Sequence, residues 1–248
     1  MSADIRNAAE SPRAIRIPAG AATLDGEILA PPDAQGLVLF AHGSGSSRHS
    51  PRNAFVARGL NRAGFGTLLF DLLTPLEDSR GPSGPRFDIA LLADRLVGAT
   101  DWLAGLQATR NLSVGYFGAS TGAAAALVAA AQRPKVVKSV VSRGGRPDLA
   151  RDALSMVDAP TRLIVGGEDP EVLELNRWSK ERMRNCDLVV VPGATHLFEE
   201  PGALQQAATQ AINWFRQFRP GPDTRRPREA PRGARPIMRE VRHEGAPA

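Results

Sequence analysis

The chain has very little cysteine and no long apolar run. Its 248 residues include one cysteine, Cys186, so an internal disulfide and a cysteine-rich metal site are excluded. No segment approaches the about 18 uninterrupted apolar residues of a membrane-spanning helix, and residues 1–10 lack the apolar core of a secretory signal. These absences predict a cytoplasmic protein with no membrane partner.

Lysine is scarce as well, and the positive charge is unevenly placed. Only three of the 31 basic residues are lysines, and the net charge is +5. The segment 219–248 contains eight arginines and four acidic residues, and so carries four of these five charges. A basic folded surface is therefore not indicated, and we expect no specific nucleic-acid partner.

Composition divides the chain into three parts. Residues 219–248 contain six prolines and few apolar residues, which predicts a disordered tail rich in proline and arginine. Residues 1–12 are expected to form a flexible leader. The part between them, 13–218, is long enough for one large domain with a substantial core.

Short apolar runs alternate with helical patterns along this central part. The alternation predicts a mostly parallel sheet with helices on both faces, preceded by two antiparallel strands and broken by an irregular stretch at 72–86. The expected strands are 14–18, 22–30, 36–41, 66–71, 112–117, 135–141, 161–165 and 187–191, and the expected helices are 52–63, 87–107, 123–131, 171–184 and 202–218.

A nucleophile motif lies near the middle of the domain. The segment Gly118-Ala-Ser-Thr-Gly122 matches Gly-x-Ser-x-Gly, between an apolar strand and an alanine-rich helix. In that setting Ser120 sits on a strained bend at the carboxyl edge of the sheet, and larger side chains at Gly118 or Gly122 would collide with the flanking strand and helix. The competing interpretation is an ordinary glycine-rich turn.

A serine hydroxyl needs a base, and the base needs an acceptor that orients it. His196 follows the last predicted strand, where the fold can bring it over Ser120, although a histidine of a surface loop fits the same pattern. Asp169 follows the preceding strand and is the expected acceptor. Glu168 competes with it, whereas Asp158 precedes that strand and should lie at the opposite edge.

An oxyanion hole requires two backbone donors. The N–H of Thr121 lies at the expected start of a helix. The second donor is expected from the loop that begins His42-Gly-Ser-Gly45, where glycine lets the backbone approach a ligand, and the Ser44 N–H is our choice. A loop that binds a phosphorylated ligand is the alternative, but the loop lacks the known glycine-rich phosphate-binding signatures.

Three further residues are candidates for substrate binding. His42 and Gly43 belong to the same loop, and Arg143 follows another strand, so all three should open toward the cleft. Arg143 is suited to a substrate carboxylate or phosphate. A structural salt bridge from Arg143 to Asp71 or Asp169 is the alternative.

Four motifs, each after its own strand, resemble those of the α/β-hydrolase superfamily and, within it, the dienelactone hydrolase family. They are His42-Gly-Ser-Gly45, 118–122, Gly166-Gly-Glu-Asp169 and Gly193-Ala-Thr-His196, within a resemblance that covers about 14–218. The resemblance implies an α/β-hydrolase fold. The dienelactone hydrolases that give the family its name use a cysteine nucleophile, whereas this chain has Ser120, so their lactone substrate is not carried over.

The sequence therefore predicts a serine hydrolase that acts on a small ester or related acyl substrate through a Ser120-His196-Asp169 triad and an acyl-enzyme intermediate. Carboxylesterase, thioesterase and lactonase activities share this machinery. No metal or organic cofactor is implied, and the oligomeric state is not predicted. The alternative is a non-catalytic binding or scaffold protein that has kept the fold.

Overall fold

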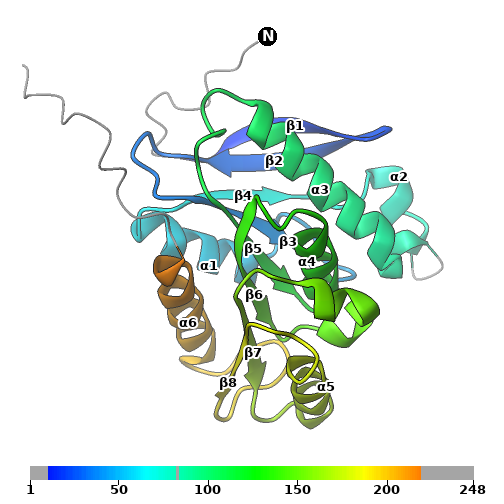
Figure 1. Cartoon of the computed structure of the whole chain (residues 1–248), viewed down its shortest axis with the longest axis vertical. Helices are drawn as coiled ribbons and strands as arrows, with labels where there is room; N and C mark the ends of the chain where they lie inside the picture. Colours follow the sequence, from blue (N-terminus) through cyan, green and yellow to red (C-terminus); the bar gives the residue numbers. More distant parts are fainter. Residues whose placement is uncertain (1–10, 82–83, 219–248) are drawn as a thin grey trace, which may run out of the picture.

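An eight-stranded sheet runs through the middle of the protein (Figure 1), in the order β1-β2-β4-β3-β5-β6-β7-β8. The computed structural model describes residues 11–81 and 84–218, so the predicted tail and most of the predicted leader lie outside the described residues. The strands are β1 (Arg13–Ala19), β2 (Ala22–Leu29), β3 (Leu37–Ala41), β4 (Gly66–Phe70), β5 (Val114–Ala119), β6 (Val137–Arg143), β7 (Thr161–Gly166) and β8 (Cys186–Val191).

The direction of the strands agrees with the sequence prediction. β2 pairs antiparallel with both β1 and β4, while all pairs from β4 to β8 are parallel. β3 and β5 are buried along their whole length, as their continuous apolar runs predict. Parallel strands deliver their carboxyl ends to one edge of the sheet, and that edge carries the candidate site.

Helices cover both faces of the sheet (Figure 1), as predicted. One face is packed by α1 (Pro51–Arg62) and α6 (Ala203–Gln217), against Val38 and Phe40 of β3. The other is packed by α3 (Ile89–Gly105) and α4 (Thr121–Gln132), against alternate residues of the same strand. Nearly all of α4 is buried, because its alanines allow both the sheet and α3 to approach closely.

The stretch predicted as irregular contains two short elements. Helix α2 (Pro75–Asp78) begins with a capping box between Thr74 and Glu77, and a 3₁₀ turn, η2 (Pro85–Phe87), follows it. Glu77 also accepts a hydrogen bond from Arg95 of α3 at 2.8 Å, which ties this stretch to the helix layer. Four residues are too few for the hydrophobic periodicity on which helix prediction depends.

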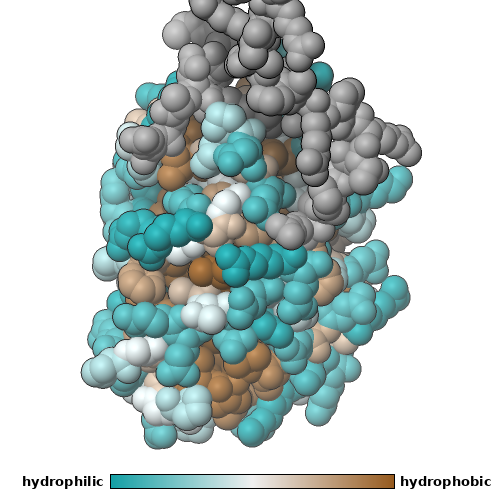
Figure 2. Space-filling view, turned by 90° about the vertical axis from the view of Figure 1, so that its left-hand side faces the viewer, coloured by the Kyte–Doolittle hydropathy of each residue, from teal (hydrophilic) through white to brown (hydrophobic). Residues whose placement is uncertain are grey.

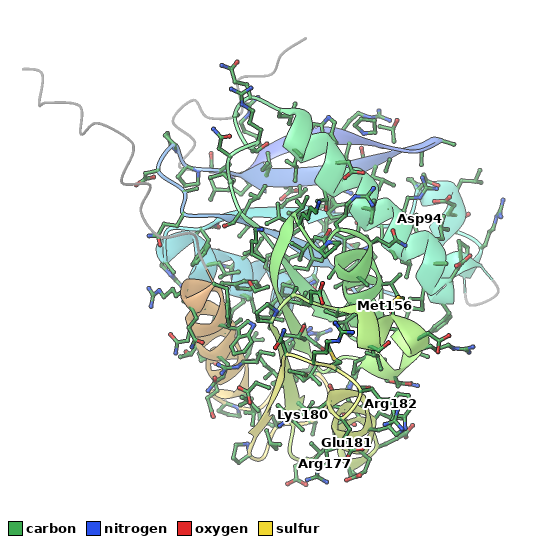
Figure 3. The ribbon with its side chains drawn as sticks, in the orientation of Figure 1. Asp94, Met156, Arg177, Lys180, Glu181 and Arg182 are labelled. Atoms are coloured by element: carbon green, nitrogen blue, oxygen red, sulfur yellow. The ribbon has the colours of Figure 1, made fainter. Side chains whose placement is uncertain are left out.

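One further element, η3, was also not predicted from the sequence. Residues Pro147–Met156 form 3₁₀ turns, η3, which are broken at Arg151 where the backbone φ is 48°. η3 packs on α4 and on α5 (Pro170–Lys180), and Met156 at its end is exposed (Figure 3). No regular spacing of apolar residues announces such a kinked segment.

The outer surface of α5 is charged. This helix ends at Lys180 rather than at 184, and Arg177, Lys180, Glu181 and Arg182 project from its end into solvent (Figure 3). The face shown in Figure 2 is mainly hydrophilic with smaller hydrophobic patches. In the described part of the chain, no helix combines the length and the apolar character needed to cross a bilayer.

Candidate active site

Ser120 occupies a sharp bend between β5 and α4. Its backbone has φ 50° and ψ −125°, a conformation that non-glycine residues rarely adopt. A Cβ atom on Gly122 would lie 2.2 Å from the carbonyl oxygen of Ala41, and one on Gly118 would lie 2.5 Å from the Cα of Ala123. The bend therefore requires glycine on both sides, for the steric reason that the sequence motif suggests.

His196 is oriented by a carboxylate. Its Nδ1–H donates to Asp169 Oδ2 at 2.7 Å, with 39% of the His196 side chain and 14% of the Asp169 side chain exposed. Glu168 is exposed, and its backbone N–H donates to Ala194 at the turn before His196. Asp158 lies before β7 and contacts Arg184 at 3.6 Å. Of the three acids weighed from the sequence, Asp169 is thus the one that contacts the imidazole.

Ser120 and His196 line the same cavity, which has a volume of about 280 Å³. With Nδ1 bound to Asp169, the neutral imidazole presents Nε2 as its acceptor. No hydrogen bond joins the two side chains in this structure, and such bonds are often long before substrate binds. Within the described residues, no three His, Cys, Asp or Glu side chains gather as a metal site.

The predicted oxyanion donors differ in their availability. The Thr121 N–H lies in the first turn of α4, whose N–H groups have no acceptor within the helix. The Ser44 N–H is already used, since it donates to the side-chain hydroxyl of Thr121 at 2.8 Å. The Ser44 N–H is therefore not free in this structure, and its role as the second oxyanion donor stays a prediction. The physical reason is that the hydroxyl oxygen of the buried Thr121 accepts the hydrogen that an oxyanion would otherwise accept.

His42 is a structural residue in this arrangement, contrary to the prediction that it binds substrate. Its Nδ1–H donates to the carbonyl of Gly43 at 3.0 Å, and its Nε2 accepts from the N–H of Leu72 at 3.0 Å. Burial lowers the pKa of His42, which agrees with a neutral ring whose two nitrogens are both occupied. Through the hydrogen bond with Leu72, the His42 ring links the loop after β3 to the loop after β4.

Gly43 lies directly against the bend. A Cβ atom at this position would be 2.9 Å from the Cβ of Ser120, so only glycine lets the loop after β3 come this close. Gly43 also lines the cavity, as the sequence predicts.

Arg143 ends β6 and lines the cavity, with only 6% of the residue exposed. Its guanidinium lies 5.7 Å from the ring centroid of Phe198, and its Nε and Nη1 atoms are buried without a hydrogen-bond partner. The predicted salt bridges are not formed, because Asp71 pairs with Arg48 and Asp169 with His196.

Arg52 and Asn53 are among the cavity residues that the sequence did not predict. Arg52 and Asn53 lie in the first turn of α1, which begins soon after the loop that follows β3. Arg52 Nη1 donates to Glu199 Oε1 at 3.0 Å, while the Oδ1 atom of the buried Asn53 has no partner. Their place after the carboxyl end of β3 was the signal that would have pointed to them.

Comparison with known proteins identifies the family to which the chain belongs. A family model described as alpha/beta hydrolase fold matches residues 36–167. The crystal structure of a dienelactone hydrolase from Anabaena variabilis is 54% identical, with a TM-score of 0.81, over 85% of this chain and 99% of that chain. Est1E from Butyrivibrio proteoclasticus shares the fold at 17% identity and a TM-score of 0.69, over 82% of this chain and 98% of its own.

Curated relatives are longer than this chain. Two proteins from strains of Mycobacterium tuberculosis, each named "Putative phosphoribosyl transferase", are 57% identical over 209 residues. The match covers 84% of this chain and 47% of each relative, so the chain spans about half the length of the curated relatives it matches. The family model and the match to the Anabaena protein over 85% of this chain show that the chain belongs to the α/β-hydrolase fold family and is dienelactone hydrolase-like.

Proposed function

We propose that the protein is a serine hydrolase that cleaves a small ester or a related acyl substrate. Membership of the α/β-hydrolase family supports hydrolysis in general. One observation carries the finer proposal: Asp169 holds His196 at 2.7 Å, and His196 lines one cavity with the strained Ser120. This is the arrangement that activates a serine hydroxyl.

In the proposed reaction, Ser120 Oγ attacks the acyl carbonyl while His196 Nε2 accepts the hydroxyl proton. Asp169 stabilises the imidazolium through Nδ1–H. The tetrahedral intermediate then collapses: the bond to the leaving group breaks, and His196 returns the proton to that group. Water, deprotonated by the same imidazole, attacks the acyl-enzyme and releases the acid and free Ser120.

The negative oxygen of the intermediate needs donors that are held in place. We assign the first to the Thr121 N–H, at the positive end of α4. The Ser44 N–H becomes the second when the oxyanion replaces the Thr121 hydroxyl as its acceptor. An anion is the stronger acceptor of the two, so this exchange favours the transition state over the free enzyme.

The names of similar proteins do not specify the substrate of this chain. Dienelactone hydrolase is the name of the Anabaena protein, and the phosphotriesterase from metagenomic libraries, at 18% identity and a TM-score of 0.69, supports the fold alone. We therefore keep carboxylesterase, thioesterase and lactonase activities open. The phosphoribosyl transferase name belongs to proteins of which this chain spans about half, so we do not propose that activity here. A cytoplasmic location stays a prediction.

Ser120→Ala tests the proposal against a panel of 4-nitrophenyl esters, acyl thioesters and lactones. We expect turnover to fall by about 10⁴-fold or more, because the nucleophile and its base act as a unit. Ser155→Ala, at an exposed serine outside the cavity lining, is the matched control and should keep turnover. Wild-type rates in Ser120→Ala would overturn the assignment. A folded wild-type protein that cleaves nothing in the panel would favour the binding or scaffold role.

A further inference from the structure

The cavity beside Ser120 is positively charged. Its lining includes the side chains of Arg52 and Arg143 and no aspartate or glutamate. Two carboxylates pair with side chains of this cavity, Asp169 with His196 and Glu199 with Arg52. Neither carboxylate is bound to Arg143, which is the more deeply buried of the two lining arginines.

The buried charge of Arg143 is energetically unfavourable. Burying a guanidinium is expensive unless its N–H groups are paired, and two of its nitrogens, Nε and Nη1, are buried without partners. Burial, followed by the charge of Arg52, lowers the pKa of Arg143 to about 10. The side chain therefore stays charged at neutral pH. Among the residues that the structure describes, the ring of Phe198, at 5.7 Å, offers this charge partial compensation.

The first turn of α1 adds to the positive potential of the cavity. Its N-cap, Ser50, accepts the Asn53 N–H, and the turn contains no acidic residue that would offset the helix dipole. Arg52, in this turn, repels Arg143. Two arginines and a helix N-terminus thus line one cavity, where an anion would relieve the repulsion and offset the buried charge of Arg143.

We propose that the part of this cavity formed by Arg143, Arg52 and the start of α1 binds an anionic oxygen group of the substrate, a carboxylate or a phosphate. The inference rests on the proposed hydrolase function and names its substrate class. Arg143 is opposite Ala119 in the sheet, and its carbonyl accepts the Ser120 N–H at 3.4 Å. Ser120 and Arg143 also line the same cavity, so one small substrate can contact both residues.

Paired substrates test the inference through activity. Mono-4-nitrophenyl glutarate is compared with its methyl ester, and the 4-nitrophenyl ester of 3-phosphonopropanoate with its dimethyl ester, by release of 4-nitrophenolate. We expect the wild type to favour the anionic member of at least one pair by about tenfold or more in kcat/KM, the range of a charge-assisted hydrogen bond. Equal kcat/KM within both pairs would overturn the proposal.

Arg143→Met removes the charge and keeps the bulk of the side chain. We expect kcat/KM for the preferred anionic ester to fall by about 10- to 100-fold and that for its neutral partner to change by less than about threefold. Arg162→Met is the matched control, since Arg162 lies on the neighbouring strand β7 and is already paired with Asp187 at 2.7 Å. An equal loss on both esters in Arg143→Met would indicate a merely structural role and contradict the proposal.

Binding without catalysis separates this inference from the proposed function. In Ser120→Ala, calorimetric titration with glutarate and with inorganic phosphate should show binding of one of them, and the added Arg143→Met change should abolish it. Preference for glutarate identifies a carboxylate, and preference for phosphate a phosphate. Absence of binding of both at millimolar concentration would overturn the inference even if esters are cleaved. Should Arg143→Met not fold, Arg52→Met, at a part-exposed side chain, should weaken the same binding about three- to tenfold.

Discussion

His196 Nδ1 lies 2.7 Å from Asp169 Oδ2, although the two residues are 27 positions apart in the chain. The contact forms because β7 and β8 are parallel neighbours whose carboxyl ends meet at one edge. It fixes the tautomer of the imidazole, so that Nε2 is left to accept a proton. The proposed chemistry therefore depends on Asp169 and not on Glu168, the exposed acid beside it.

Asp169→Asn should therefore lower kcat by about 10³- to 10⁴-fold, because an amide stabilises neither the tautomer nor the imidazolium. Glu168→Gln, at the adjacent position, is the control and should change kcat by less than about twofold. The release of 4-nitrophenolate from a single 4-nitrophenyl ester measures kcat for both variants. Equal losses in the two variants would argue against Asp169 as the orienting acid.

Thr121→Val should destabilise the protein. The change removes the acceptor of the Ser44 N–H and leaves a partly buried donor unpaired, at a cost of about 1–3 kcal/mol in the free energy of unfolding. Thr121→Ser keeps the hydroxyl and should recover most of that loss. Urea denaturation measures the difference, and a valine variant as stable as the wild type would show that the bond contributes little.

His42 should make the protein less stable in mild acid. Burial lowers its pKa in the folded state, so below about pH 6.5, the ordinary value, the unfolded chain takes up a proton that the folded one refuses. Stability from this source is present above that pH and is lost as the pH falls. His42→Gln lacks the effect, so its deficit in unfolding free energy should shrink between pH 7 and pH 5. A constant deficit contradicts the prediction.

Cys186 should be dispensable. Burial raises the pKa of its thiol to about 12, so almost no reactive thiolate exists at neutral pH. The residue also begins β8, at the opposite end of that strand from the loop that carries His196. Cys186→Ser should keep ester hydrolysis within about twofold, and iodoacetamide should label the folded wild type slowly. Loss of activity in the serine variant would reopen the question of a cysteine nucleophile.

Residues that depend on a local motif could be predicted from the sequence. The strands, their mostly parallel direction and the bend at Ser120 follow from apolar runs and from glycines whose missing side chains avoid a clash. The order of the motifs along the chain also placed Asp169 and His196 after adjacent strands.

Residues that depend on contacts between distant loops could not be predicted. Nothing in the loop after β3 shows that Leu72 will donate to His42, or that the Thr121 hydroxyl will take the Ser44 N–H. Arg143 was recognised by its place after a strand, but its lack of a carboxylate partner is a property of the packed structure alone. Side-chain competition of this kind is decided by tertiary packing rather than by sequence pattern.

Labelling by a fluorophosphonate tests the central claim most directly. An activated serine attacks the phosphorus, fluoride leaves, and the probe stays bound to Oγ. We predict one label per wild-type chain, located at Ser120 by peptide mass spectrometry, with no label in Ser120→Ala and little in Asp169→Asn. A folded wild-type protein that takes up no probe, or takes it up at another residue, would contradict the account.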